Sequence, residues 1–412
     1  MKKTISILLT LILMAFQMSA QWAPRAAFSG IAKAKSTSFT IGSKIYVMGG
    51  TDNSGVILND FWEYDIPTNS WLQKPNFPGP ERYGAASFVI NGKGYIATGG
   101  NNFGYLDDLW EYNPLTSQWI QKSGLPAFSA QHENQRTEAF AFEVNNKGYL
   151  GGGVGFVFGP NSTSNIAFVD LWEYNPILNS WIQKSDLPDL GKNMGIAVAI
   201  NGKGYVGLGC NVDQTINHRS LWEYNATTDI WTAKAIFPTN FTTDAGAFTL
   251  NNNLYVVGGV NLNPVSLSSQ FYKYDLTSNT WTSLTAFTGG AIAGEFAISN
   301  GTTAFVGTGY NGSIITRSDV WEWTIPTGLN DPSDPSMTKI NIVPNPASDH
   351  INIQSSKQVS GVEIYSVNGA LVTKFESDPS NINIAELPSG MYLLRIKFID
   401  DQYQMERFIK TK

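Results

Sequence analysis

The chain has 412 residues, 42% of them hydrophobic and 13% aromatic, enough for one large repeat fold and a smaller module. Only 15% of the residues are charged, and the 39 glycines and 12 tryptophans indicate turn-rich, aromatic-packed β structure. The net charge of −6 disfavours nucleic acid binding. Because Cys210 is the only cysteine, an intrachain disulfide and a cysteine-ligated zinc cluster are excluded.

Residues 1–20 have the pattern of a signal peptide. A basic start at Lys2 and Lys3 precedes an apolar stretch, Ile5–Phe16, and Ala20 supplies a small residue for cleavage. This stretch falls short of the roughly 20 apolar residues that a spanning helix needs. We therefore predict export to the periplasm and no transmembrane segment.

A motif of the form Trp-Glu-Tyr-Asx recurs at intervals of about 50 residues. Four clear copies begin at Trp62, Trp110, Trp172 and Trp222, and two weaker ones at Tyr272 and Trp321. A glycine cluster precedes each copy, and in five copies a second tryptophan stands seven residues after the motif tyrosine: Trp71, Trp119, Trp181, Trp231 and Trp281. A fixed period of this length indicates a repeat architecture.

The glycine pair, tyrosine and spaced tryptophan resemble the kelch repeat, which implies one four-stranded blade per copy. Six copies predict an all-β fold, a six-bladed propeller over residues 21–326. The last copy has Asn330 where the second tryptophan belongs, whereas Trp22 precedes Gly49 much as Trp71 precedes Gly99. We therefore expect an N-terminal strand around Trp22 to complete the sixth blade and leave no open sheet edge.

Residues 327–338 are rich in Pro, Asp and Ser and are typical of a linker. Short β-patterned runs over residues 339–412 then predict a small β-sandwich. Its sequence blocks resemble the type IX (Por) secretion sorting domain: Val343–Ala347, Ile364–Gly369, Leu387–Tyr392 and Lys410–Lys412. The resemblance implies passage across the outer membrane by the type IX machinery, and a secreted or cell-surface location. An ordinary adhesive β-sandwich is the alternative.

The longer loops of the repeats are expected on one face of the propeller, where binding sites usually lie. Alignment of these loops places four cations at one position and two carboxylates at another, and these six are the candidate ligand-binding residues: Lys33, Arg82, Arg136, Lys192, Glu138 and Asp244. A rim of cations would suit a carboxylated sugar or another anion. A structural role within the repeats is the alternative, and the carboxylates either neutralise the cations or serve as acid and base.

The third repeat carries the longest loop, Val154–Val169, which either overhangs the channel mouth or is a neutral insertion. Acids recur just before the third strand of the repeat and are interpreted as turn-capping residues: Asp60, Asp108, Asp170 and Asp319.

Kelch propellers include copper oxidases that act on galactose, but Cys210, His132 and His218 do not match the ligand set that this resemblance requires. We expect no metal and no cofactor. A binding module for a glycan or protein ligand on the long-loop face is favoured. The alternatives are a carbohydrate-active enzyme resembling the kelch-type sialic acid mutarotases, and a purely structural surface protein. Catalytic residues are not identifiable from the sequence.

Overall fold

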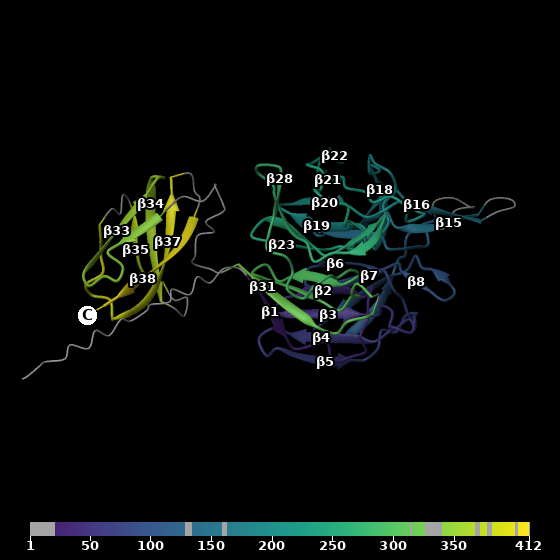
Figure 1. Ribbon diagram of the computed structural model, residues 1–412, viewed down its shortest axis with the longest axis horizontal. Helices are drawn as coiled ribbons and strands as arrows, with labels where there is room; N and C mark the ends of the chain where they lie inside the picture. The colour runs from purple at the N-terminus through teal and green to yellow at the C-terminus, as the bar shows by residue number, and fades with distance from the viewer. Residues whose placement is uncertain are drawn as a thin grey trace, which may run out of the picture. The chain divides into compact units, whose positions relative to one another are not determined.

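The computed structural model describes residues 21–127, 134–158, 163–313, 315–325, 340–366, 371–376, 381–399 and 403–411. The expected signal peptide and the expected linker fall outside these ranges. The chain divides into two compact units, Trp22–Thr324 and one that begins at Ile325, and each is described by itself (Figure 1). All regular elements of the described residues are β-strands, as predicted. Within these ranges no helix has the length and apolar character needed to cross a membrane.

The larger unit contains six four-stranded antiparallel sheets, here called blades 1 to 6. The strands are given from the innermost outward. Blade 1 holds β2 (Thr37–Ile41), β3 (Lys44–Met48), β4 (Phe61–Asp65) and β5 (Ser70–Lys74), and blade 2 holds β6 (Ala86–Ile90), β7 (Lys93–Ala97), β10 (Leu109–Asn113) and β11 (Gln118–Lys122). Blade 3 holds β13 (Phe140–Val144), β14 (Lys147–Gly151), β17 (Leu171–Asn175) and β18 (Ser180–Lys184). Blade 4 holds β19 (Ile196–Ile200), β20 (Lys203–Gly207), β21 (Leu221–Asn225) and β22 (Ile230–Ala233), blade 5 holds β23 (Gly246–Leu250), β24 (Asn253–Val257), β27 (Phe271–Asp275) and β28 (Thr280–Ser283), and blade 6 holds β29 (Phe296–Ser299), β30 (Thr303–Gly307), β31 (Val320–Thr324) and β1 (Gln21–Arg25).

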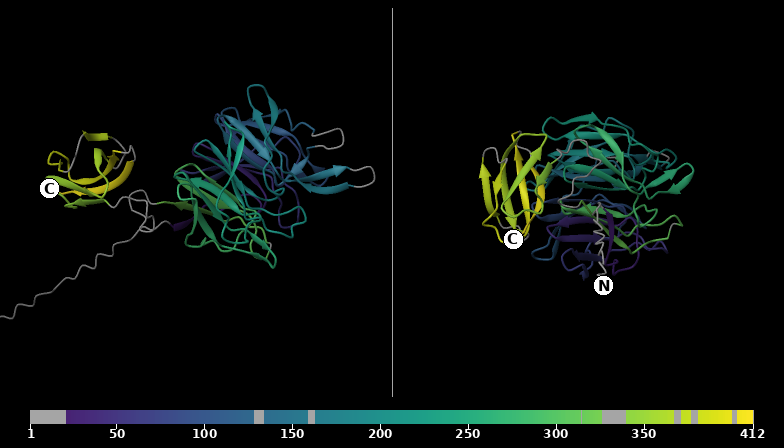
Figure 2. Two further views of the ribbon diagram at one scale, coloured as in Figure 1. Left: turned by 90° about the horizontal axis from the view of Figure 1, so that it is seen from above. Right: turned by 60° about the vertical axis from the view of Figure 1, so that its left-hand side comes forward.

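The blades form a closed ring. Each innermost strand contacts the innermost strands of both neighbours, and β29 contacts β2. Figure 2 shows the strands of this unit, coloured by residue number, from two further sides. The N-terminal strand β1 is the outer strand of blade 6, as predicted, because it pairs with β31. Trp22 anchors this strand: it is 7% exposed, and its ring lies 4.7 Å from that of Phe287 and 5.1 Å from that of Phe271.

The motif tyrosine and the second tryptophan are cross-strand partners that also join adjacent blades. In blade 3, Tyr174 pairs with Trp181, and the Tyr174 hydroxyl donates to Asn179 Oδ1 at 2.8 Å. The same oxygen accepts the backbone N–H of Ser123, which follows blade 2, while Trp181 Nε1 donates to the Ser123 carbonyl. Three side-chain hydrogen bonds of this kind therefore join a blade to the segment that follows the preceding blade.

Blade 2 lacks these hydrogen bonds. Pro75 stands where Ser123 stands in the next repeat, and proline has no N–H to donate. Ser117 accordingly replaces the asparagine acceptor. The Tyr112 hydroxyl and Trp119 Nε1 have no hydrogen-bond partner among the described residues.

A buried ion pair lies within most blades. Arg136 is fully buried, and its guanidinium donates to both carboxylate oxygens of Asp170 at 2.6 and 2.7 Å. Trp172 Nε1 donates to the same carboxylate at 2.7 Å. The same group of a cation, a carboxylate and an indole occurs in three other blades: Arg82 with Asp108 and Trp110, Lys33 with Asp60 and Trp62, and Arg317 with Asp319 and Trp321. The turn-capping interpretation of these acids was therefore wrong, because their side chains accept from a cation and an indole.

Three small sheets lie outside the blades, in loops between the second and third strands or before the first. They are the hairpins β8 (Gly100–Asn101) with β9 (Gly104–Tyr105) and β25 (Val260–Leu262) with β26 (Val265–Leu267), and the sheet of β12 (Arg136–Thr137), β15 (Val154–Phe158) and β16 (Thr163–Ala167). The long loop of the third repeat is thus a β-hairpin, β15–β16, which projects from the ring (Figure 1).

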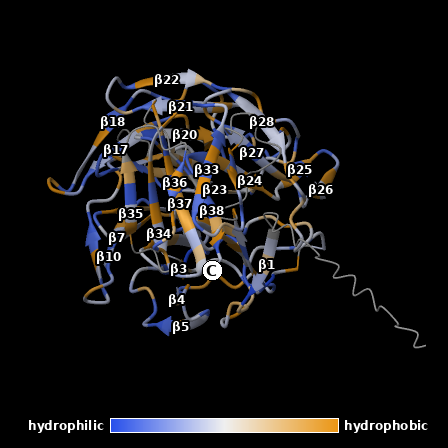
Figure 3. Cartoon of the chain, turned by 90° about the vertical axis from the view of Figure 1, so that its left-hand side faces the viewer, coloured by the Kyte–Doolittle hydropathy of each residue, from blue (hydrophilic) through white to orange (hydrophobic). Residues whose placement is uncertain are grey.

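The C-terminal unit has two sheets, as expected for a sandwich. One contains β32 (Ile340–Val343), β33 (His350–Ser355) and β36 (Ile382–Asn383), and the other β35 (Leu371–Glu376), β34 (Val359–Ser366), β37 (Gly390–Phe398) and β38 (Tyr403–Lys410). Buried and less buried residues alternate along β37 from Tyr392 to Phe398. Figure 3 shows hydrophobic and hydrophilic segments on the strands of this unit. The buried side chains form one core that includes Ile351, Ile364, Leu394 and Phe408.

We predict that Trp22→Ala in the mature chain lowers the free energy of unfolding of the propeller by about 3–5 kcal/mol, because it removes a large ring from the closure of blade 6. All 12 tryptophans lie between Trp22 and Trp323, so tryptophan fluorescence during denaturant unfolding reports on this unit alone. Ala23→Ser, at an exposed position of the same strand, is the control. Equal stability of the two variants would show that β1 is not needed for closure.

Arg136→Met should cost about 3–5 kcal/mol, because it leaves the Asp170 carboxylate buried without its cation. The matched variant Lys93→Met removes a 41% exposed lysine from Glu111 and should cost about 1 kcal/mol or less. The measurement is again fluorescence-detected unfolding. A loss for Arg136→Met no larger than that for Lys93→Met contradicts the structural role of the buried pair.

Candidate functional site

The four predicted cations do not rim the channel. Lys33, Arg82, Arg136 and Lys192 are each at most 1% exposed. Lys192 lacks an acid just before the third strand of its blade, and Asp189 pairs with it instead at 2.9 Å. The expected basic rim is therefore corrected: these charges point into the blades, where their carboxylates neutralise them.

The two predicted carboxylates do come together at the channel. Glu138 and Asp244 occupy the same position of their repeats, two residues after the buried cation position. One residue from each blade occupies this position, each with a left-handed φ between 51° and 63°: Lys35, Gly84, Glu138, Met194, Asp244 and Gly294. Backbone N–H···O=C bonds of 2.8–3.1 Å join five of the six successive pairs, all except Glu138 and Met194. This closed arrangement, here called the axial ring, must surround the propeller axis.

Lys35 reaches across the axial ring. Its ammonium lies 2.8 Å from Glu138 Oε1 and 3.5 Å from Asp244 Oδ2, in blades 3 and 5, and 3.8 Å from the sulfur of Met194 in blade 4. A side chain from blade 1 with partners in these blades has to lie at the axis. Tyr310 completes the group because its hydroxyl donates to Asp244 at 2.7 Å. We call Lys35, Glu138, Asp244 and Tyr310 the mouth cluster.

Burial and charge set the protonation of this cluster. Burial lowers the pKa of Lys35, but the charges of Asp244 and Glu138 outweigh it and hold the pKa above its usual value. Burial raises the pKa of Glu138, against the opposing effect of Lys35. Burial also raises the pKa of Glu295, next to the axial ring, to about 8. The site therefore contains a fixed ammonium, and the neighbouring carboxyl group of Glu295 can hold a proton near neutral pH.

Two glycines of the axial ring leave room for the larger side chains. A Cβ at Gly84 would lie 2.7 Å from Glu138 Cδ, and one at Gly294 would lie 2.7 Å from the Tyr310 ring. Any other residue at either position would displace part of the mouth cluster.

Two tyrosines lie close enough to the mouth cluster to feel the charge of Glu138. Tyr83 directly precedes Gly84. Burial raises the pKa of both Tyr83 and Tyr105, and the charge of Glu138 raises it further. Tyr105 stacks on Phe156 of the β15–β16 hairpin with centroids 4.7 Å apart and planes 12° apart. Phe168 instead lies over Arg136 at 3.9 Å, and the Phe158 side chain lies outside the described residues.

Lys35 was missing from the sequence-based candidates, and Tyr83 and Tyr310 were considered for stacking on sugar rings, with packing as the favoured interpretation. The signal that identifies Lys35 was present, because it aligns with Glu138 and Asp244 two residues after Lys33. Its sign differs from theirs, so a search for a repeated residue type passes over it. Tyr310 comes from a different loop and has no sequence relation to Asp244.

No group of three His, Cys, Asp or Glu side chains suited to a metal occurs among the described residues. Burial raises the pKa of the Cys210 thiol to about 11. Burial also lowers the pKa of His218, whose ring lies within the protein. His132 lies outside the described residues.

Comparisons with known proteins agree with this architecture. A KLHDC2/KLHL20/DRC7 Kelch-repeats domain model matches residues 18–193, a Kelch motif model matches residues 242–288, and a secretion system C-terminal sorting domain model matches residues 341–411. A solved structure titled "Structure of YjhT" aligns with a TM-score of 0.58 and 17% identity, over 71% of this chain and 95% of that one. At this identity the likeness shows the fold alone.

Curated relatives include proteins named N-acetylneuraminate epimerase from Shigella flexneri and from Escherichia coli K12. Each is 36% identical over 86 residues, which is 20% of this chain and 23% of the relative. The chain therefore matches about a quarter of the length of these relatives. Together, the matched models and the propeller identify kelch-repeat domains in this chain, followed by a secretion system C-terminal sorting domain.

Proposed function

We propose that the propeller is a binding module that takes a glycan at the mouth cluster. The observation that carries this proposal is the position of Lys35 between two carboxylates at the propeller axis, with aromatic rings beside them. An ammonium and carboxylates are donors and acceptors for sugar hydroxyl groups. Aromatic faces such as those of Tyr83 and Tyr105 suit the apolar faces of pyranose rings. Few polar groups beside aromatic walls are typical of ligand sites.

The charge of the mouth favours a neutral sugar over an acidic one. The cations expected to hold a carboxylate are paired inside the blades, and Lys35 is already bonded to Glu138 and Asp244. A carboxylated ligand would therefore face two acidic side chains and one neutralised ammonium. Like charges within a few ångströms repel one another.

An isomerase is the second candidate. The relatives named N-acetylneuraminate epimerase favour it, as does the chemistry of two carboxyl groups beside one ammonium. In this alternative, Glu138, whose pKa is raised by burial, serves as proton donor and Asp244 as acceptor.

The sorting domain directs the proposed location. We infer that residues 339–412 present the mature chain to the type IX machinery and that the propeller acts in the medium or on the cell surface. Removing residues 339–412 should leave the propeller in the periplasm of the producing cell, whereas the full chain should appear outside. Fractionation followed by immunoblotting decides this, and export of the truncated chain would contradict the inference.

Glu138→Gln and Asp244→Asn should each weaken glycan binding about tenfold or more, since a charge-assisted hydrogen bond contributes about 1.5–3 kcal/mol. A glycan array probed with the mature chain identifies the ligand, and calorimetry with the strongest hit measures the loss. Glu63→Gln is the control, because Glu63 also binds lysines, at 3.1 and 3.3 Å, but lies on the outer part of blade 1.

The same variants separate binding from catalysis. Unchanged affinity in both mouth variants would overturn the mouth as the binding site. Proton NMR of freshly dissolved N-acetylneuraminate tests the alternative. An enzyme would be indicated if the wild-type chain accelerates the interconversion of its anomers and Glu138→Gln lowers that rate by a factor of about 100 or more. The binding-module proposal would then be wrong.

A further inference from the structure

The mouth cluster contains one ammonium and two carboxyl groups. The Lys35 ammonium lies 2.8 Å from Glu138 Oε1 and 3.5 Å from Asp244 Oδ2. The other cations near the entering loops do not balance the second carboxyl group, because each has a carboxylate partner in its own repeat: Lys33, Arg82, Arg136, Lys192 and Arg317. Among the described residues, the mouth therefore has one acidic group more than it has cations.

A single ammonium leaves the two carboxyl groups incompletely stabilised. Burial raises the pKa of Glu138, the charge of Lys35 opposes this rise, and the charge of Asp244 adds to it. Burial also raises the pKa of Tyr310, and the charges of Asp244 and Glu138 raise it further. A second cation close to Glu138 would favour its ionised form. The mouth therefore favours a ligand group with a positive charge over a neutral one.

Two carboxyl oxygens of the mouth cluster are available to such a group. Glu138 accepts from Lys35 through Oε1, and Asp244 accepts from Tyr310 through Oδ2. Glu138 Oε2 and Asp244 Oδ1 accept no hydrogen bond from the described residues, and neither is among the buried atoms that lack a partner. Because the two side chains are 11% and 8% exposed, a ligand can reach these oxygens.

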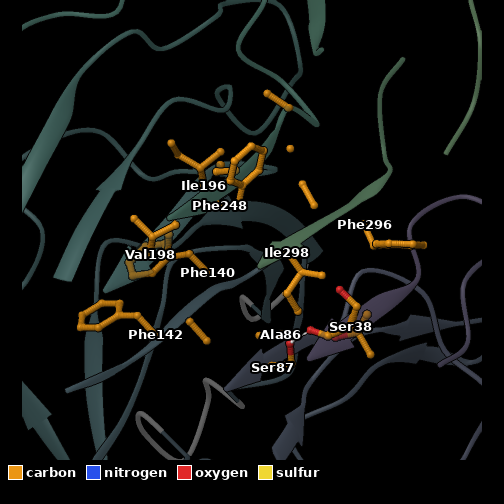
Figure 4. A pocket seen from close by; sticks show the side chains of 18 of the residues that line it. Ser38, Ala86, Ser87, Phe140, Phe142, Ile196, Val198, Phe248, Phe296 and Ile298 are labelled. Carbon is orange, nitrogen blue, oxygen red and sulfur yellow. Dashed lines mark hydrogen bonds between the residues drawn. The ribbon is translucent and has the colours of Figure 1, made fainter. Parts of the chain in front are cut away.

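The open channel beneath the axial ring offers no comparable group. Its wall is formed mainly by the innermost strands, and Figure 4 shows Phe142 and Val198 among its side chains. The hydroxyl groups of Ser87 and Ser299 already donate to backbone carbonyls of neighbouring innermost strands. Among the described residues that line the channel, Glu295 alone is ionisable, and its Oε2 is buried. Recognition of a charged ligand group therefore falls to the mouth cluster.

We propose that the ligand of the mouth is a glycan with a free amine, as in a chain of unacetylated amino sugars. This inference rests on the glycan-binding function proposed above and specifies the class of glycan. The ammonium of the sugar donates to Glu138 Oε2 and Asp244 Oδ1 and balances the second carboxylate. Hydrogen bonds between two charged groups are roughly twice as strong as those between neutral groups, so an amine is preferred to a hydroxyl at this place. N-acetylation removes the charge and therefore the preference.

An array of matched glycans tests the proposal with the mature chain. In each set, glucose, galactose or mannose carries a hydroxyl, an acetamido or a free amino group at C2. We expect the amino member of the strongest set to bind about tenfold or more tightly than its two partners in calorimetry. Added salt should weaken the amino member more than its partners, because it screens the attraction between charges.

Three variants link this preference to the mouth. Asp244→Asn should weaken the amino glycan about tenfold or more, and its neutral partners less. Lys35→Met removes the competing ammonium and should strengthen binding of the amino glycan about threefold or more, without strengthening its neutral partners. Glu63→Gln, on the outer part of blade 1, is the control and should leave the affinity unchanged. The unfolding midpoint of each variant shows whether the fold is intact.

The outcomes separate this inference from the function on which it rests. Equal or tighter binding of the hydroxyl or acetamido members, lost in Asp244→Asn, overturns the preference for an amine and leaves the mouth as the glycan site. Binding of the amino glycan that is unchanged in both Asp244→Asn and Glu138→Gln overturns the preference and the site together. An array on which the wild-type chain binds no glycan has the same consequence.

Discussion

The buried cation–carboxylate–indole group is the interaction on which the rest of the propeller depends. It joins the loop that enters a blade to the third strand of that blade, as Arg136 joins Asp170 and Trp172. Two residues further along the chain, the backbone turns into the left-handed region at the axial ring. Because the cation is fixed inside the blade, the following side chain is held at the axis. In blade 3 the ion pair thereby determines where Glu138 lies, whereas in blade 5, which has Thr242 in place of the cation, Gln270 holds the loop that precedes Asp244.

Variation among the blades shows that this group is maintained by compensation. Blade 4 has Ser220 in place of the usual acid, and Asp189 from the entering loop takes its role with Lys192. Blade 6 has Ile292 in place of the cation, and Arg317 supplies one from the third-strand side. Blade 5 has Thr242 and Gln270 at the two positions, and Gln270 bonds with the carbonyls of Phe241 and Gly258. A neutral amide thus replaces the ion pair, and the loop stays joined to the sheet.

The fold was largely readable from the sequence because each of its constraints is local and repeated. Tyrosine and tryptophan spaced seven residues apart are cross-strand partners in every copy that has both, and Trp22 identified the closing strand. The site was readable only in part. Alignment grouped Glu138 with Asp244 correctly, but it could not show that Arg82 and Arg136 point away from the channel. Side-chain direction depends on a partner, Asp108 or Asp170, from a distant strand. Tyr310 is likewise joined to Asp244 only in three dimensions.

The central claim is that the mouth cluster receives the ligand. Nuclear magnetic resonance of tyrosine-labelled mature chain, titrated with the strongest glycan-array ligand, measures this directly. Binding at the mouth predicts saturable shifts at Tyr83, Tyr105 and Tyr310, with the buried motif tyrosines such as Tyr174 unchanged. Saturable shifts confined to other tyrosines, with these three unaffected, would contradict the claim and place the ligand elsewhere on the protein.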